Sequence, residues 1–126
     1  MSGNPVTWFE IYVQDAPRAR RFYEATLAVT LAKLDTPVGD VTGMWSFPAA
    51  RESHGATGAL VKMDGVGSGG SGTIVYFECA DCAVEAGRVT ANGGTIVKPK
   101  FAIGQFGFIA LATDTEGNMI GLHSMK

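Results

Sequence analysis

The chain has 126 residues, of which 46% are hydrophobic and 17% charged, and its formal net charge is −2. This is enough chain for one ordinary domain with a buried core, and the charge argues against nucleic acid as a partner, because phosphate binding needs a basic face. No apolar run approaches the roughly 18 residues that cross a membrane, and the opening MSGNPVTW lacks the parts of a secretion signal. We therefore expect no nucleic-acid or membrane partner and a cytoplasmic location.

The first half of the chain predicts a strand, a helix and three more strands. Residues 6–13 alternate and are rich in β-branched and aromatic side chains, which favours a strand. Asp15 is a suitable N-cap, and residues 17–28 repeat apolar side chains at helical spacing. Turn-forming segments then separate three short predicted strands, at residues 30–34, 41–47 and 56–63.

The second half repeats this order after a glycine-rich linker at residues 64–72. A strand is predicted at residues 73–79, followed by a helix that Asp81 caps and that the Asn-Gly-Gly of residues 92–94 ends. Three strands follow, at about residues 95–103, 106–113 and 118–124. The chain is therefore expected to be a single domain of the α+β class, with one βαβββ module at residues 5–63 and a second at residues 73–126.

The two halves also contain similar short sequence segments at equivalent positions. TWFEIYVQD near the start has its counterpart in VYFECADC, and GALVKM at the end of the first half has its counterpart in GLHSMK. Two copies of a unit this long are too few for a solenoid. A duplicated module explains the pattern better.

With these features the sequence resembles the vicinal-oxygen-chelate superfamily, which includes glyoxalase I, bleomycin-resistance proteins and extradiol dioxygenases. The resemblance rests on FEIYVQDAPRARRFYEATLAVTL, on VYFECADCAVEAGRVTANGGTIVKPK and on GFIALATDTEGNMIGLHS. It implies curved mixed sheets, one from each βαβββ module, that enclose a cavity for a small molecule. It also implies that two copies of the chain pair as a homodimer.

The resemblance implies four repeat-related positions at which metal-dependent members carry His, Glu or Gln ligands. In this sequence they fall on Trp8, Ala59, Tyr76 and Gly121, with Ile74 or Val75 in place of Tyr76 if the register shifts. These residues do not form a metal centre of the family type. We therefore predict no metal site and no cofactor, which places glyoxalase and dioxygenase activity in doubt.

Three polar side chains lie two residues beyond these positions, on the same strand faces. They are Glu10, Glu78 and His123, and all three are predicted to point into the cavity. Three interpretations remain open for them: a displaced metal site, acid–base catalysis, or a polar lining that binds a ligand or forms internal hydrogen bonds. As a catalytic set, they would carry proton transfers.

Aromatic side chains are the other candidate site residues. Trp8, Trp45, Tyr76 and Phe106, with Gly121 beside them, are predicted to bind a flat ligand, although core or dimer packing explains Trp45 equally well. The favoured function is metal-independent binding of a small aromatic or amphipathic molecule. The alternative is an enzyme, a lyase, isomerase or glyoxalase-like protein, that uses Glu10, Glu78 and His123; a scaffold that only dimerises is a third possibility.

Two smaller features stay open on sequence alone. Cys79 and Cys82 have the C-x-x-C spacing of a redox pair or of half a zinc site, but they also suit a strand-to-helix corner. The glycine-flanked turn at residues 104–107 is either a mobile lip over the cavity or a plain hairpin connection. His54, in a loop before a strand, is interpreted as a surface histidine.

Overall fold

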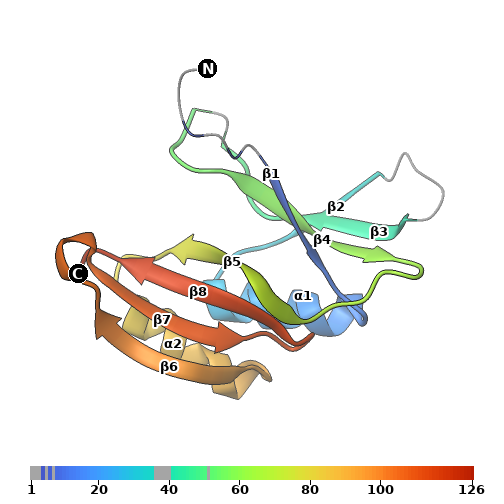
Figure 1. Ribbon diagram of the computed structural model, residues 1–126. Helices are drawn as coiled ribbons and strands as arrows, with labels where there is room; N and C mark the ends of the chain where they lie inside the picture. Colours follow the sequence, from blue (N-terminus) through green and yellow to red (C-terminus); the bar gives the residue numbers. More distant parts are fainter. Residues whose placement is uncertain (1–3, 5, 7, 36–40, 51) are drawn as a thin grey trace.

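The computed structural model describes residues 4, 6, 8–35, 41–50 and 52–126. It contains two four-stranded sheets with helices packed between and beneath them (Figure 1). Among the described residues no helix is both long and apolar enough to cross a membrane. Pro5 and Thr7, which belong to the first predicted module and strand, lie outside the described residues.

The first module forms one mixed sheet, in which strand order differs from chain order. Its strands run β1-β4-β3-β2, and β1 pairs with β4 in parallel while the other pairs are antiparallel. The N-cap of α1 is Asp15, whose Oδ1 accepts the Arg18 N–H at 3.0 Å, as the sequence predicts. The elements are β1 (Trp8–Tyr12), α1 (Ala16–Leu27), β2 (Ala32–Leu34), β3 (Val41–Ser46) and β4 (Thr57–Met63).

The second module repeats the arrangement with strand order β5-β8-β7-β6, and β5 pairs with β8 in parallel. Asp81 caps α2 by accepting the Ala83 N–H at 3.0 Å. The elements are β5 (Gly70–Glu78), α2 (Cys82–Val89), the 3₁₀ turn η1 (Thr90–Asn92), β6 (Thr95–Ala102), the 3₁₀ turn η2 (Gly104–Phe106), β7 (Phe108–Thr113) and β8 (Asn118–Ser124).

The predicted α+β class and the tandem βαβββ modules are confirmed, although the two sheets do not close around an enclosed cavity. Two boundaries differ from the prediction. Gly70–Gly72, expected in the linker, begin β5, because Gly70 pairs with Asn118 and the Asn118 side chain accepts the Gly69 N–H at 2.7 Å. Phe106, expected in a strand, lies in η2, where positive φ angles at Gly104 and Gly107 bend the chain.

One hydrophobic core joins the two modules. It includes the fully buried Phe22 and Tyr23 of α1, together with Leu122 of β8. Packed against it, the repeat-related rings of Phe9 and Phe77 meet edge to face, with centroids 6.0 Å apart. The internal duplication therefore brings the same position of each module to one aromatic contact.

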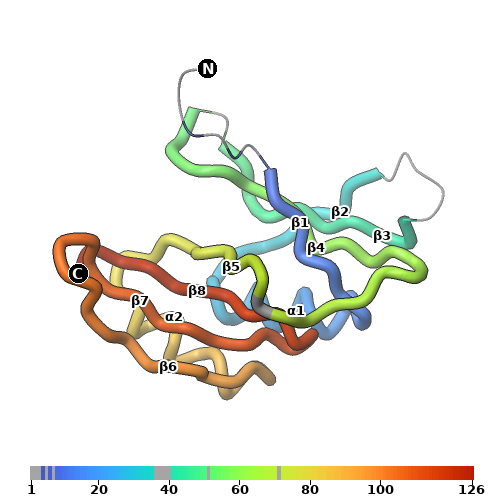
Figure 2. Tube along the Cα trace, in the orientation of Figure 1, coloured from blue at the N-terminus to red at the C-terminus, as the bar shows by residue number. Residues whose placement is uncertain are grey.

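The turn between β7 and β8 fastens the second module to the start of α1 (Figure 2). The Glu116 carboxylate, which is fully buried, accepts the backbone N–H groups of Gln14 and Asp15 at 2.9 Å each and pairs with Arg18 at 2.8 Å. Burial alone would raise the pKa of Glu116, but the hydrogen bonds from Arg18 and from these amides outweigh it and lower the pKa to about 2.

A second set of hydrogen bonds strengthens the same junction. The buried Tyr23 hydroxyl donates to Asp114, and burial followed by that carboxylate raises the pKa of Tyr23 well above its usual range. Asn118 donates its side-chain N–H groups to the Tyr12 carbonyl and to Asp114, at 3.0 Å each. These contacts set how the two sheets face each other, and so they set the shape of the space between them.

Candidate functional site

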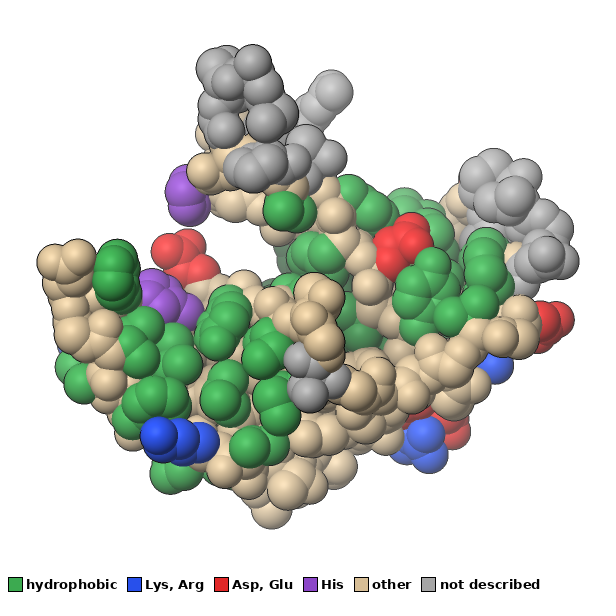
Figure 3. All heavy atoms as spheres, in the orientation of Figure 1, with side chains coloured by type: hydrophobic (Ala, Val, Ile, Leu, Met, Phe, Trp, Pro, Cys, Tyr) green, Lys and Arg blue, Asp and Glu red, His purple; other side chains and the backbone are tan. Residues whose placement is uncertain are grey.

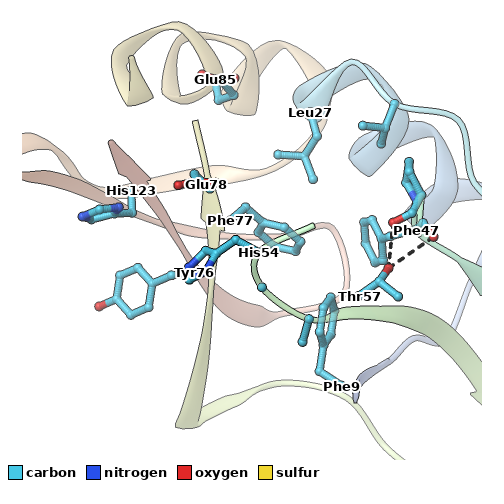
Figure 4. A pocket seen from close by; sticks show the side chains of 14 residues that line it. Phe9, Leu27, Phe47, His54, Thr57, Tyr76, Phe77, Glu78, Glu85 and His123 are labelled. Atoms are coloured by element: carbon cyan, nitrogen blue, oxygen red, sulfur yellow. Dashed lines mark hydrogen bonds between the residues drawn. The ribbon is translucent and has the colours of Figure 1, made fainter. Parts of the chain in front are cut away.

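A cleft of about 550 Å³ lies between the two modules, and residues from both of them line it. In the space-filling view it appears as a hollow with histidine side chains on both sides (Figure 3). In the close-up, Glu78 and His123 lie on one side, Phe47 and Thr57 on the other, and Phe77 and Leu27 between them (Figure 4). The lining residues are Phe9, Leu27, Val29, Phe47, Pro48, His54, Gly55, Ala56, Thr57, Tyr76, Phe77, Glu78, Glu85 and His123.

The inner wall of the cleft is aromatic. Phe9, Phe47 and Phe77 stand with ring centroids 5.5–6.0 Å apart, and Phe47 also packs edge to face on the buried Tyr23. On the rim, the Thr57 hydroxyl lies within hydrogen-bond distance of the Phe47 and Pro48 carbonyls, at 3.3 and 2.9 Å (Figure 4). The wall is therefore part of the core and is held in place before any ligand binds.

The opposite rim carries the polar groups. Glu78 of β5 and His123 of β8 are register partners on adjacent parallel strands. The His123 Nε2 lies 2.7 Å from the Phe106 carbonyl oxygen. Because a carbonyl only accepts, this contact places the proton on Nε2 and leaves Nδ1 of the neutral ring as an acceptor. The pair can therefore bind a ligand donor or accept a proton from one.

Tyr76 lines the outer edge of the cleft, whereas Gly121, which was predicted to bind the ligand, is buried and does not line it. The Tyr76 side chain lies across β8 directly over Gly121, so that a Cβ at position 121 would overlap the tyrosine ring. Tyr76 is also 48% exposed, which is unusual for so large an apolar ring. The glycine predicted as a ligand-binding position thus acts by leaving room for the tyrosine.

Glu85 of α2 also lines the cleft and lies beside Cys79. Its Oε1 is buried and has no hydrogen-bond partner among the described residues. Burial, and then the neighbouring Glu85 carboxylate, raise the pKa of the Cys79 thiol to about 12. The thiol therefore stays protonated at neutral pH, which is the opposite of a reactive cysteine.

The two cysteines themselves are free in the structure. Cys82 is fully buried at the first position of α2, and its N–H is bonded to the Ser124 hydroxyl at 2.9 Å. Cys79 is half-buried at the end of β5 and donates to the Phe77 carbonyl at 3.6 Å. Of the three interpretations that the sequence leaves open, these surroundings favour packing at a strand-to-helix corner.

Glu10, the polar residue that the first module was predicted to place in the cavity, does not line the cleft. Glu10 lies outside the cleft, in a smaller depression of about 240 Å³ beside the linker. It accepts hydrogen bonds from Trp8 Nε1 at 3.2 Å and from the Tyr12 hydroxyl at 2.8 Å, and the latter bond raises the pKa of Tyr12. The prediction that Glu10, Glu78 and His123 share one cavity is corrected: only the last two line the cleft.

Two predicted aromatic ligand contacts also lie elsewhere. Trp45 packs against the core on the helix side of its sheet, with Arg20 and Lys33 each about 6.0 Å from the ring centroid. Trp8 is exposed beside Glu10. The Phe106 ring is 64% exposed and is not part of the cleft lining, although the Phe106 carbonyl holds His123.

The residues at the four metal positions that the resemblance implies do not fit a metal ion. Gly121 lies beneath the Tyr76 ring, and Ala59 is buried among apolar side chains. Trp8 offers only an indole N–H, which Glu10 already accepts. Within the described residues there is no group of three or more His, Cys, Asp and Glu side chains placed to hold a metal.

Several cleft residues have no counterpart in the sequence-based prediction. Phe9 and Phe77 alternate with the predicted cavity residues Glu10 and Glu78, and a period of two separates the strand faces but does not show where two sheets meet. Glu85 carried a signal that was overlooked: with Cys82, Ala86 and Val89 it falls on the apolar stripe of its helix. A glutamate within such a stripe indicates a buried carboxylate.

No family model matches the sequence, and no curated protein matches it significantly. Solved structures do resemble it. Glyoxalase I from Zea mays is 23% identical with a TM-score of 0.74, over 96% of this chain and 46% of that one. Glyoxalase/bleomycin-resistance proteins from Frankia sp. EAN1pec and Albidiferax ferrireducens T118 are 19% and 20% identical, with TM-scores of 0.72 and 0.71. The Frankia match covers 99% of this chain and 100% of that one, and the Albidiferax match covers 94% and 98%.

The chain thus has the glyoxalase/bleomycin-resistance fold, as the resemblance to the vicinal-oxygen-chelate superfamily implies. It spans about half the length of the maize glyoxalase I chain, of which 46% is covered. At these identities the likeness concerns the fold, and one fold of this kind hosts many activities.

Proposed function

We propose that the protein binds a small, flat, largely apolar molecule in the cleft between its two modules, without the help of a metal ion. The single observation that supports this most is the preformed aromatic wall, formed by Phe9, Phe47 and Phe77 with polar groups on one rim. A cleft of about 550 Å³ falls in the range that drug-sized ligands occupy. The phenylalanine rings would provide apolar contact area for the ligand, and the polar groups of the rim would orient it.

The structural neighbours agree with a small-molecule site. They include glyoxalase I from Zea mays and a glyoxalase/bleomycin-resistance protein from Albidiferax ferrireducens T118. The family metal positions do not carry a ligand set in this chain, which supports binding through shape and stacking alone.

Filling the cleft tests the proposal. Isothermal titration with tryptophol, a neutral indole alcohol, is expected to show saturable binding that a metal chelator does not change. Ala56→Trp, at an exposed cleft position, should abolish binding, because the new ring occupies the space between the walls. Ala25→Trp, at an exposed position of α1 that does not line the cleft, is the control and should bind like the parent protein. Equal binding by both variants would contradict the proposal.

The homodimer implied by the resemblance remains a prediction. Its support is the helix-free face of the second sheet, where apolar side chains gather (Figure 3) and where Ile109 and Leu111 lie opposite His123 and Gly121. Sedimentation velocity is expected to give twice the chain mass. Leu111→Glu on that face should yield a monomer, whereas Val84→Glu, at an exposed position of α2, should not. A parent protein that sediments as a monomer would contradict the predicted homodimer.

A further inference from the structure

The hydrogen bond between His123 and the Phe106 carbonyl fixes which ring nitrogen of the histidine carries a proton. His123 lines the cleft, and its Nε2 lies 2.7 Å from that carbonyl oxygen. A carbonyl oxygen only accepts, so Nε2 carries the proton in this contact. In the neutral ring, Nδ1 is then left as a hydrogen-bond acceptor.

The turn that supplies this carbonyl is packed against the end of β8, so the contact exists without a ligand. Gly107 has a φ of 97°, and its N–H donates to the Gly104 carbonyl at 3.3 Å. A Cβ at position 107 would overlap the Ser124 carbonyl oxygen at the end of β8. The glycine-flanked turn η2 therefore places the Phe106 carbonyl next to His123.

The cleft rim presents a second acceptor beside His123. Glu78, the register partner of His123 on the adjacent parallel strand, is exposed, and its carboxylate makes no hydrogen bond with a described residue. The Nδ1 atom of His123 also has no partner among the described residues, and it is not buried. Figure 4 shows both side chains on the same side of the cleft. A ligand that reaches this rim therefore meets two accessible acceptors.

The other histidine of the cleft differs from His123 in this respect. His54 is exposed in the loop before β4 and makes no hydrogen bond with a described residue. Neither of its ring nitrogens is therefore fixed as donor or acceptor, and it can serve either kind of ligand group. Selection between ligand groups thus falls to His123 and Glu78.

A neutral donor complements this rim better than a charged group does. A ligand carboxylate brings only acceptors, and it would face Glu78 with the same charge. A ligand cation would pair with Glu78, but ion pairs of exposed carboxylates contribute little. A neutral hydroxyl or N–H group supplies the hydrogen that Nδ1 of His123 lacks.

We infer that the ligand of the cleft is a neutral aromatic molecule with a hydroxyl or N–H group, which donates to Nδ1 of His123 while the ring packs against the phenylalanine wall. This inference rests on the proposed function and specifies it. His123 selects the ligand through its unprotonated nitrogen, and Glu78 disfavours anions. The Phe106 carbonyl acts through His123, as a positioning group.

Two pairs of probes test this selection by equilibrium dialysis at about pH 8, above the range in which histidine side chains usually titrate. 2-Naphthol has a hydroxyl donor and indole an N–H donor, whereas 2-methoxynaphthalene and 1-methylindole keep the rings without the donor. Each donor probe is expected to bind about fivefold more tightly than its methylated counterpart, although the latter is more apolar. A preference within one pair only supports the inference and identifies the group, hydroxyl or N–H, that the rim accepts.

The variant His123→Phe keeps an aromatic ring on β8 and removes the acceptor, so it should abolish the preference within each pair. His54→Phe makes the same change at the other cleft histidine and should keep the ratio of the two affinities, whatever its effect on each. Thermal unfolding establishes that both variants fold. In the parent protein, the nitrogen-15 signal of His123 Nδ1 should shift when 2-naphthol is added, but not when 2-methoxynaphthalene is added.

The outcomes separate the two proposals. If donor and methylated probes bind equally, or if a folded His123→Phe keeps the preference, selection by His123 is overturned while binding in the cleft stands. The same holds if the cation 2-naphthylmethylamine binds more tightly than 2-naphthol, because pairing with a carboxylate would then dominate. If no probe binds the folded parent protein, the proposed function and this inference fall together. If the preference is lost in His123→Phe and kept in His54→Phe, both are supported.

Discussion

Replacing Glu116 with alanine is expected to lower the free energy of unfolding by about 3 kcal/mol, since a buried charged acceptor and its ion pair are removed together. The Gln14 and Asp15 amides would lose their acceptor, and the second module would lose its main polar attachment to α1. Arg18 is half exposed and can be rehydrated, so most of the cost comes from the amides. Urea unfolding followed by circular dichroism measures the change.

A charge-matched control separates this effect from net charge. Glu52→Gln, at an exposed position, should alter stability by less than about 0.5 kcal/mol. Because folding lowers the pKa of Glu116 from its ordinary 4.5 to about 2, its contribution is complete above pH 4.5 and disappears as the pH falls towards 2. The parent protein should therefore lose stability over that range more steeply than Glu116→Ala. If the stabilities of the parent protein and of Glu116→Ala fell equally with pH, the proposed role of Glu116 in joining the second module to α1 would be contradicted.

Phe47→Ala is expected to destabilise the protein by about 3 kcal/mol and to weaken tryptophol binding strongly, because one ring serves both the core and the cleft. Phe47 is nearly fully buried and packs on Phe9, Tyr23 and Phe77, with centroids 5.5–5.7 Å apart. Its loss would leave a cavity at the junction of the two modules. Urea unfolding and isothermal titration measure the two effects on the same preparation.

The matching control is Phe106→Ala. That ring is exposed and does not line the cleft, so the same chemical change should cost less than about 0.5 kcal/mol and leave tryptophol affinity unchanged. The backbone carbonyl that holds His123 is kept in this variant. If both substitutions lowered stability and tryptophol affinity to a similar extent, the proposed role of Phe47 in the core and in the cleft wall would be contradicted.

The fold was largely predictable from the sequence, because its signals are local and repeated. The order of helices and strands in both modules was predicted correctly from strand alternation, from the helix caps Asp15 and Asp81, and from the repeated sequence segments. The start of β5 was missed, because glycines in a linker-like run pair only through a distant partner, Asn118. Composition alone does not reveal a pairing of that kind.

The candidate site was predicted only in part. Tyr76, Glu78 and His123 were correctly placed near one another, since they lie on paired strands of one module. Glu10 and Trp8, their counterparts in the other module, were expected beside them but lie outside the cleft. Repeat symmetry gives equivalent positions within each module, whereas the cleft depends on how the modules are joined, which Glu116 and the aromatic core determine.

The location of the bound probe tests the central claim most directly. Amide chemical shifts of isotope-labelled protein, recorded during a tryptophol titration, should change for residues around Phe47, Thr57, Tyr76 and His123, which line the cleft from both modules. Residues beside Glu10 in the smaller depression should be unaffected. Changes confined to that depression or to the open face of the second sheet, or no changes at all, would contradict a binding site between the modules.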